Sequence, residues 1–249
     1  MRPVTLLAVL SVLISSQACE AVTLKVGLID HDRPPYFWLP TSDNPPRGAY
    51  IDILEYIGQR LDIEFEYQFL PQARIRHYMK NQRLDLEPGI DSGWRTEPGE
   101  REASVYTLPL FRSEEVIVYN RSRFSPQPEI DTFVGARPCK VLGFNNFELS
   151  NDRLEIEREL LTEAQLFEML LKGRCDYALF PTDVFSFARI DERLAATLPV
   201  ASYDLRIRLS RQYAYLVPDF NRVINELRGS NQIRVIFEKY QRNKSSAEN

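Results

Sequence analysis

The chain has 249 residues, of which 44% are hydrophobic and 27% charged, and its formal net charge is −4. This composition supports a real hydrophobic core and excludes a disordered chain. The net negative charge argues against nucleic acid as a main partner. The length fits one large domain or two small lobes.

The N-terminus has the order of parts found in a secretory signal peptide, here 1–21. A short positive segment precedes the mostly apolar run 4–14, which is far shorter than the roughly 20 residues that span a bilayer. Small residues permit cleavage after Ala18 or after Ala21, and we favour Ala21 because a strand pattern follows it. We therefore expect a periplasmic protein. The alternative, a lipid anchor on Cys19, stays open.

The first part of the mature chain alternates between strand and helix patterns. The predicted elements are strands at 23–29, 63–69 and 84–87, an amphipathic helix that carries Ile51, Leu54, Ile57 and Leu61, and a helix from Pro71 to Lys80. A polar loop at 91–101 follows them. The β-α-β-α-β order predicts a mainly parallel sheet.

A second α/β run follows a strand at 115–119. Its predicted elements are strands at 140–144 and 176–180 and a helix that opens with a Thr162–Gln165 capping box and ends at Gly173. Further strands are predicted at 205–209 and 213–217, before two amphipathic helices separated by Gly229. Two α/β units predict two lobes with a cleft. Because ligands bind beyond the carboxyl ends of such strands, we expect the site in the loops after Ile29, Glu87, Phe144 and Phe180.

The cysteines and histidines limit the chemistry. If Cys19 leaves with the signal peptide, Cys139 and Cys175 remain as an even pair in an oxidising compartment. His31 and His77 lie far apart, with no cysteine or carboxylate spaced as a metal site requires. We therefore expect no metal and no cofactor.

Several segments together resemble the bacterial extracellular solute-binding proteins of family 3, the periplasmic receptors for polar amino acids. The resemblance covers nearly the whole mature chain and depends on the order and spacing of its segments more than on any one motif. These segments are KVGLIDHDRPPYF, GAYIDILEYIGQRLDIEFEY, RTEPGERE, TEAQLFEMLLKGRCDYALFPTD and the C-terminal IRVIFEKYQ.

The resemblance implies an α/β fold, a type II periplasmic-binding-protein clamshell in which each lobe is a mixed, mainly parallel sheet flanked by helices. Lobe one would hold 22–111 and 209–249, and lobe two 112–208. Strands near 112–116 and 206–211 would cross between them. A solute would bind between the lobes, and closure would bury it.

The resemblance also implies ligand-binding residues. Arg101 matches an arginine whose guanidinium forks onto a ligand carboxylate. Pro98 and Gly99 lengthen the loop before it, so Arg95 is an alternative, and a solvated loop arginine is the plainer interpretation. Arg74, which opens a helix beside the cleft, is a further candidate for the carboxylate.

Other matched positions suggest contacts with an amino group or an aromatic stack. Asp183 matches the residue that takes a ligand's amino group, and a helix N-cap is its alternative role. One residue of the run Tyr36, Phe37 and Trp38 is expected to stack on the ligand while the other two pack in the core. Trp94 has the same two interpretations.

The remaining candidates lie at strand ends. Asp91 and Ser92 would contact an amino group or simply form a turn. Asn145 and Asn146 would present amides to an anion or form a tight turn.

The resemblance also places side by side the strands that begin with Cys139 and Cys175, which implies a disulfide in lobe two. Two buried free thiols are the alternative.

The predicted function is capture of a small polar solute, an amino acid or related zwitterion or carboxylate, by a monomeric protein that serves an ABC permease or a membrane sensor. An enzyme on the same fold, dehydratase-like, is an alternative, with His31, His77, Glu87 and Asp91 as acid or base candidates. No nucleophile with a paired base is visible, so we expect no enzyme. The other alternative is an orphan module without a small-molecule ligand.

Overall fold

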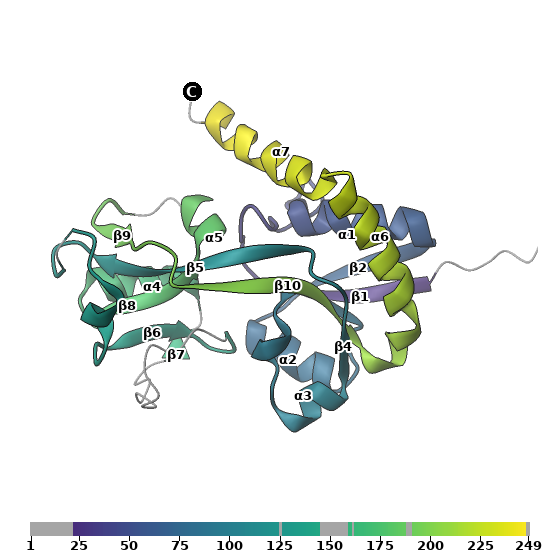
Figure 1. Ribbon diagram of the computed structural model, residues 1–249, viewed down its shortest axis with the longest axis horizontal. Coiled ribbons are helices and arrows are strands. Elements are labelled where there is room, and N and C mark those ends of the chain that lie inside the picture. The colour runs from purple at the N-terminus through teal and green to yellow at the C-terminus, as the bar shows by residue number, and fades with distance from the viewer. Residues whose placement is uncertain (1–21, 125, 145–158, 161, 188–190, 248–249) are drawn as a thin grey trace, which may run out of the picture.

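The computed structural model describes residues 22–124, 126–144, 159–160, 162–187 and 191–247 (Figure 1). The predicted signal peptide with Cys19 and the predicted contacts of Asn145 and Asn146 lie outside these residues. Within the described residues, no helix combines the length and apolar character that crossing a membrane requires.

The strands of the described chain form one sheet. They are β1 (Val22–Leu28), β2 (Ile63–Phe69), β3 (Leu86–Ile90), β4 (Ser104–Tyr106), β5 (Phe111–Asn120), β6 (Pro138–Val141), β7 (Glu159–Leu160), β8 (Tyr177–Pro181), β9 (Leu194–Ala196) and β10 (Ala201–Ser210). Their order is β2-β1-β3-β10-β5-β8-β6-β7, with β4 paired to β10 and β9 to β5.

Strand β10 joins the two ends of this sheet. Its residues Ala201–Leu205 pair antiparallel with β5, and Arg206–Leu209 pair antiparallel with β3. At one end β1 is parallel to β2 and β3, and at the other β6 is parallel to β7 and β8. The sheet is therefore parallel toward its two ends and antiparallel in the middle.

The helices gather around these two ends (Figure 1). Around β1–β4 lie α1 (Ala49–Leu61), α2 (Gln72–Lys80), α3 (Pro98–Glu102), α6 (Val217–Gly229) and α7 (Gln232–Ala247), and around β5–β9 lie α4 (Glu163–Leu171) and α5 (Thr182–Phe187). Short 3-10 helices are η1 (Ser92–Trp94), η2 (Ile130–Phe133) and η3 (Arg211–Leu216). We call the first group lobe one and the second lobe two. The α/β prediction is confirmed, while the residue limits of the lobes stay a prediction.

Helix α1 fixes the aromatic loop that follows β1. Its N-cap Gly48 has a φ of 137°, and a Cβ there would lie 2.3 Å from the Cα of Phe37. Only glycine suits such a backbone and such a close approach. The amide of Tyr50 donates to the carbonyl of Tyr36 at 2.9 Å, and Ile51 is buried as predicted. The loop is therefore held against the start of the helix.

Helix α4 begins as its sequence predicts. The Thr162 hydroxyl accepts from the amide of Gln165, and the Gln165 side chain accepts from the amide of Thr162. Leu166 and Leu170 are buried against lobe two. This cap sets Glu163 in the first turn of the helix, where its side chain reaches lobe one.

The prediction of a strand at 213–217 is wrong. Strand β10 ends at Ser210, η3 follows, and α6 begins at Val217 with Pro218 in its first turn. Proline suits that position because its φ is already helical and its missing N–H would have no partner there. Tyr215 is 65% exposed, so no buried face supports a strand.

Two smaller differences concern β3 and the loop after it. The third strand spans Leu86–Ile90, beyond the predicted 84–87, and the predicted loop at 91–101 holds η1 and most of α3.

The structure joins Cys139 and Cys175 in a disulfide, with their Cα atoms 5.7 Å apart, as predicted. Cys139 lies on β6, and Cys175 comes just before β8, which pairs with β6.

Candidate ligand-binding site

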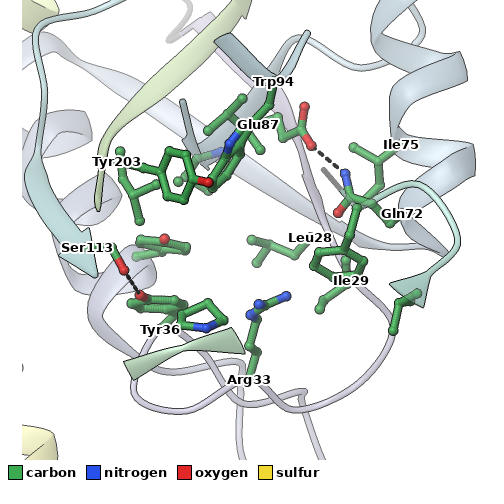
Figure 2. A pocket seen from close by; sticks show the side chains of 18 of the residues that line it. Leu28, Ile29, Arg33, Tyr36, Gln72, Ile75, Glu87, Trp94, Ser113 and Tyr203 are labelled. Atoms are coloured by element: carbon green, nitrogen blue, oxygen red, sulfur yellow. Dashed lines mark hydrogen bonds between the residues drawn. The ribbon is translucent and has the colours of Figure 1, made fainter. Parts of the chain in front are cut away.

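A cavity lies between the two lobes, at the carboxyl ends of strands β1 and β3 of lobe one and β6 and β8 of lobe two (Figure 2). Its wall combines apolar and aromatic side chains with a small set of charged and polar ones. The polar and aromatic members of the wall are Arg33, Tyr36, Phe37, Tyr50, Gln72, Glu87, Trp94, Arg95, Ser113, Glu114, Glu115, Phe144, Glu163, Phe180 and Tyr203. Arg33, Tyr36 and Phe37 come from the loop after Ile29, and Trp94 and Arg95 from the segment after Glu87, where the strand-end rule predicts a site. The segment that follows Phe144 lies outside the described residues.

Tyr36 forms one corner of the cavity. Its ring stacks on Tyr50 with centroids 4.8 Å apart, and its hydroxyl lies 3.2 Å from the Ser113 hydroxyl. Burial, and secondly the charge of Asp183, raise the pKa of the Tyr36 phenol far above its usual range. The hydroxyl therefore stays protonated and can act as a fixed donor.

A buried ionic cluster lies behind another part of the wall. Glu87 accepts hydrogen bonds from Gln72 at 2.8 Å, Arg95 at 3.1 Å and Arg208 at 2.9 Å. Burial alone would raise the pKa of Glu87, but the two guanidinium groups hold it below its usual range. The cluster fixes Arg95, 2% exposed, at the cavity wall.

A separate ion pair, between Arg33 of lobe one and Glu163 of lobe two, joins the two lobes at the cavity. The Arg33 guanidinium lies 3.1 Å from a Glu163 carboxylate oxygen, and His31 Nε2 lies 3.5 Å from the other oxygen. The Arg33 Cζ atom also lies 4.7 Å from the ring centroid of Phe144 and 6.0 Å from that of Phe180. Figure 2 shows the guanidinium pointing into the cavity.

The wall opposite Arg33 is aromatic. Trp94 and Tyr203 meet edge to face with centroids 4.8 Å apart. The Tyr203 hydroxyl donates to a Glu115 carboxylate oxygen at 3.0 Å. Burial, followed by the charge of Glu115, raises the pKa of the Tyr203 phenol, so this donor also keeps its proton.

Of the predicted site residues, Tyr36, Phe37 and Trp94 line the cavity. The third member of the aromatic run, Trp38, instead packs on Tyr240 of α7 with centroids 5.3 Å apart. Tyr36 and Phe37 therefore face the cavity, whereas Trp38 packs away from it.

Other predicted residues are not part of the cavity wall. Asp91 accepts from the amides of Gly93 and Asp204, which is the turn-forming alternative, and Ser92 is exposed beside it. Arg74 is exposed on α2. Asp183 accepts a hydrogen bond from the Tyr36 hydroxyl, where the sequence predicted a contact with the amino group of a ligand.

Arg101 is exposed on α3 and is likewise not part of the wall. Pro98 begins a helix at this point, so the residues that lengthen the loop wind into α3. Glu100, 2% exposed, turns inward and pairs with Arg76 at 2.7 Å. The neighbouring Arg95 is the arginine of this segment that reaches the cavity.

The sequence predictions missed several residues of the wall, chiefly Arg33, Gln72, Ser113, Glu115, Glu163 and Tyr203. Arg33 stands three residues before Tyr36 in a loop already expected to face the ligand, and Glu163 follows the predicted N-cap. The places of Arg33 and Glu163 in the sequence could therefore have identified both as candidates. In the described residues, no three His, Cys, Asp or Glu side chains are grouped to hold a metal.

A sheet shared by two lobes, with a polar and aromatic cavity between them, defines a two-lobed binding protein. The family profile of bacterial extracellular solute-binding proteins, family 3, matches residues 24–243, so the chain belongs to that family. No curated protein sequence matches the chain.

Solved structures share the fold at low identity. The L-arginine-bound amino acid ABC transporter substrate-binding protein AbpA from Streptococcus pneumoniae is 15% identical, with a TM-score of 0.72 over 89% of this chain and 95% of that one. A mutant of ArgBP from T. maritima is 19% identical, with a TM-score of 0.68 over 88% and 94%. A histidine kinase sensor domain similar to periplasmic binding proteins is 20% identical, with a TM-score of 0.69 over 88% and 95%. The two-lobed clamshell fold is thereby confirmed.

Proposed function

We propose that the chain captures a small zwitterion of the amino-acid class between its two lobes. The observation that carries this proposal is the buried Arg95 guanidinium at the cavity wall, held by Glu87 at 3.1 Å. A planar guanidinium held in a buried position suits a carboxylate, because its charge and the direction of its N–H groups are already fixed.

The rest of the wall suits the remainder of such a solute. Glu115, 6% exposed, and the exposed Glu114 add carboxylates that can take an ammonium group. Tyr36, Trp94 and Tyr203 offer aromatic faces, which attract both apolar side chains and cations. Solved structures of relatives with bound arginine and with bound glutamine support an amino-acid ligand.

The proposed setting is the periplasm, after removal of the signal peptide at 1–21, with the protein acting as a monomer. The proposed lobe limits are 22–111 with 209–249 and 112–208. The solute would pass to an ABC permease or be reported to a membrane sensor, because similar structures include both a transporter component and a kinase sensor domain.

The test is a thermal-shift panel of amino acids, polyamines and small organic acids on the mature protein. Each amino acid that binds is compared with its N-acetyl and amide forms, which lack one charge each. We expect a saturable rise in Tm with at least one zwitterion, since a ligand that binds only the folded state stabilises it by mass action. Both blocked forms should lose that rise. A panel without any stabilising zwitterion contradicts the proposal.

A further inference from the structure

We propose that Arg33 is a built-in cation that fills a guanidinium site of the cavity and thereby excludes solutes with a second positive charge. For the natural solute this inference rests on the proposed function. The guanidinium site itself stands on its own contacts.

Three side chains of lobe two form the site. The Glu163 carboxylate lies 3.1 Å from the Arg33 guanidinium, and the rings of Phe144 and Phe180 lie 4.7 and 6.0 Å from its Cζ atom. A carboxylate with aromatic rings is the set of groups that binds a planar cation, through charge and through the negative faces of the rings.

The cation comes from the other lobe. Arg33 belongs to the loop after β1, which turns back on itself through hydrogen bonds from the amides of Tyr36 and Phe37 to the Arg33 carbonyl. Phe144, Glu163 and Phe180 belong to lobe two. Arg33 therefore extends from lobe one and places its guanidinium against the groups of lobe two at this end of the cavity.

The site requires a positive charge. The side chains of Arg33 and Glu163 are each 11% exposed. Burial would raise the pKa of Glu163, but Arg33 and, less strongly, His31 hold it below its usual range. Removing one partner of a buried pair leaves an uncompensated charge, which is strongly unfavourable. Without Arg33, the Glu163 carboxylate would lack its close guanidinium partner.

A consequence for specificity follows. A solute that carries its own guanidinium or ammonium toward this end of the cavity meets both a filled space and a like charge. The cavity therefore favours amino acids with uncharged or acidic side chains over those with a second cation.

The experiment replaces the missing side chain with a small molecule. Arg33→Ala removes the fragment that N-ethylguanidinium reproduces, so this ion is titrated into the variant by calorimetry and thermal shift, with sodium chloride at equal concentration as the salt control. We expect saturable binding to Arg33→Ala and a rise in its Tm. The unmodified protein should show neither effect, because its site is filled.

Two controls identify the site. Arg47→Ala removes an exposed arginine that also stacks on a ring, at 4.8 Å from Trp38, but does not line the cavity, and it should not gain binding. Arg33→Ala combined with Glu163→Gln should lose binding, because the carboxylate is gone. Equal binding of N-ethylguanidinium to Arg33→Ala and to the unmodified protein overturns the proposal.

Two further measurements on Arg33→Ala test the proposal: whether the variant folds without the added ion, and which amino acids it binds. If Arg33→Ala folds only when N-ethylguanidinium is present, the proposal is supported, and if the ion aids neither folding nor binding, it is overturned. The titration needs no knowledge of the natural solute, so its failure is distinct from failure of the proposed function. On the amino-acid panel, Arg33→Ala should gain affinity for arginine relative to the unmodified protein, and no gain contradicts the role in specificity.

Discussion

The Tyr36 hydroxyl donates a hydrogen bond of 3.3 Å to the carboxylate of Asp183, which lies 147 residues further along the chain. Tyr36 belongs to lobe one and Asp183 to α5 of lobe two. The bond therefore joins the lobes beside the cavity. Asp183 has a protein partner where the sequence predicted an amino group of the ligand.

Replacing Asp183 should stabilise the protein at neutral pH. Burial raises the pKa of Asp183 in the folded state, and together with the smaller effect of the Glu114 charge it outweighs the hydrogen bond from Tyr36, which lowers this pKa. The folded state then holds this proton to higher pH than the unfolded chain does, so stability is lost as pH rises above the usual aspartate pKa. Asp183→Asn should raise Tm at pH 7 by up to about 3 °C, and the gain should shrink in acid. Calorimetry at both pH values checks this, and a lower Tm at pH 7 contradicts it.

Asp176 provides a control of opposite sign. Burial would raise its pKa, but hydrogen bonds from Arg137 and the charge of Arg123 hold the pKa below its usual range. Its contribution to stability is present above the aspartate pKa of the unfolded chain and lost as pH falls through the lower folded value. Asp176→Asn should therefore lower Tm at pH 7, with a difference that disappears in acid.

The two arginines of the segment after β3 should differ in their effect on solute binding. Arg95→Gln should weaken binding at least about tenfold, because a hydrogen bond between charged groups contributes about 1.5–3 kcal/mol. Arg101→Gln should leave affinity within about twofold, since a solvated surface charge contributes little. Calorimetric titration with the zwitterion found in the panel compares them. Arg95→Lys keeps the positive charge beside Glu87 and so tests whether weak binding reflects loss of the guanidinium contact or loss of folding. If Arg101→Gln weakens binding more than Arg95→Gln does, Arg101 is the residue that binds the carboxylate.

Closure of the lobes should depend on Gly143. A Cβ at this position would lie 2.8 Å from the amide nitrogen of Ala73 on α2, across the gap between the lobes, and its φ is 87°. Gly135 has a similar φ of 78° but nothing within 4 Å of its Cβ position. Substitution by alanine strains the backbone in both cases, but only Gly143→Ala also pushes the lobes apart.

Small-angle scattering with saturating solute measures the effect. Gly143→Ala should keep a larger radius of gyration and bind the solute about tenfold more weakly, which corresponds to about 1.4 kcal/mol. Gly135→Ala should lower Tm about as much as Gly143→Ala does, because both strain the backbone, but its lobes should close normally. Equal affinities for the two variants would show that Gly143 does not limit closure.

The disulfide should contribute strongly to the stability of lobe two. Cys139 and Cys175 are 36 residues apart, and a loop of that length corresponds to about 4 kcal/mol in the chain-entropy description. Urea unfolding with and without reductant should show a loss of about 2–5 kcal/mol, and the Cys139→Ala, Cys175→Ala double variant should match the reduced protein. Alkylation of both thiols before any reduction contradicts the pairing.

Local signals predicted the fold well and the site only in part. The Thr162–Gln165 capping box and the inward face of α6 depend on neighbours within one turn, so the sequence carries them. The strand predicted at 213–217 is wrong because Pro218 lies in the first turn of α6, and the residues before it form η3. Position in a loop could suggest Arg33, but its role could not be predicted, because its partners lie more than one hundred residues away in the other lobe.

Strand β10 also has a consequence for the order in which the chain matures during synthesis. Its residues Ala201–Ser210 complete the edges of both β3 and β5, yet they leave the ribosome after the other strands. Until then β3 lacks a partner on this edge, and β5 lacks one along Phe111–Glu115 although β9 already pairs with its far end. Unpaired strand edges are a known route to aggregation. A fragment ending at Val200 should therefore aggregate and be cleaved within lobe one by a protease that spares the full chain.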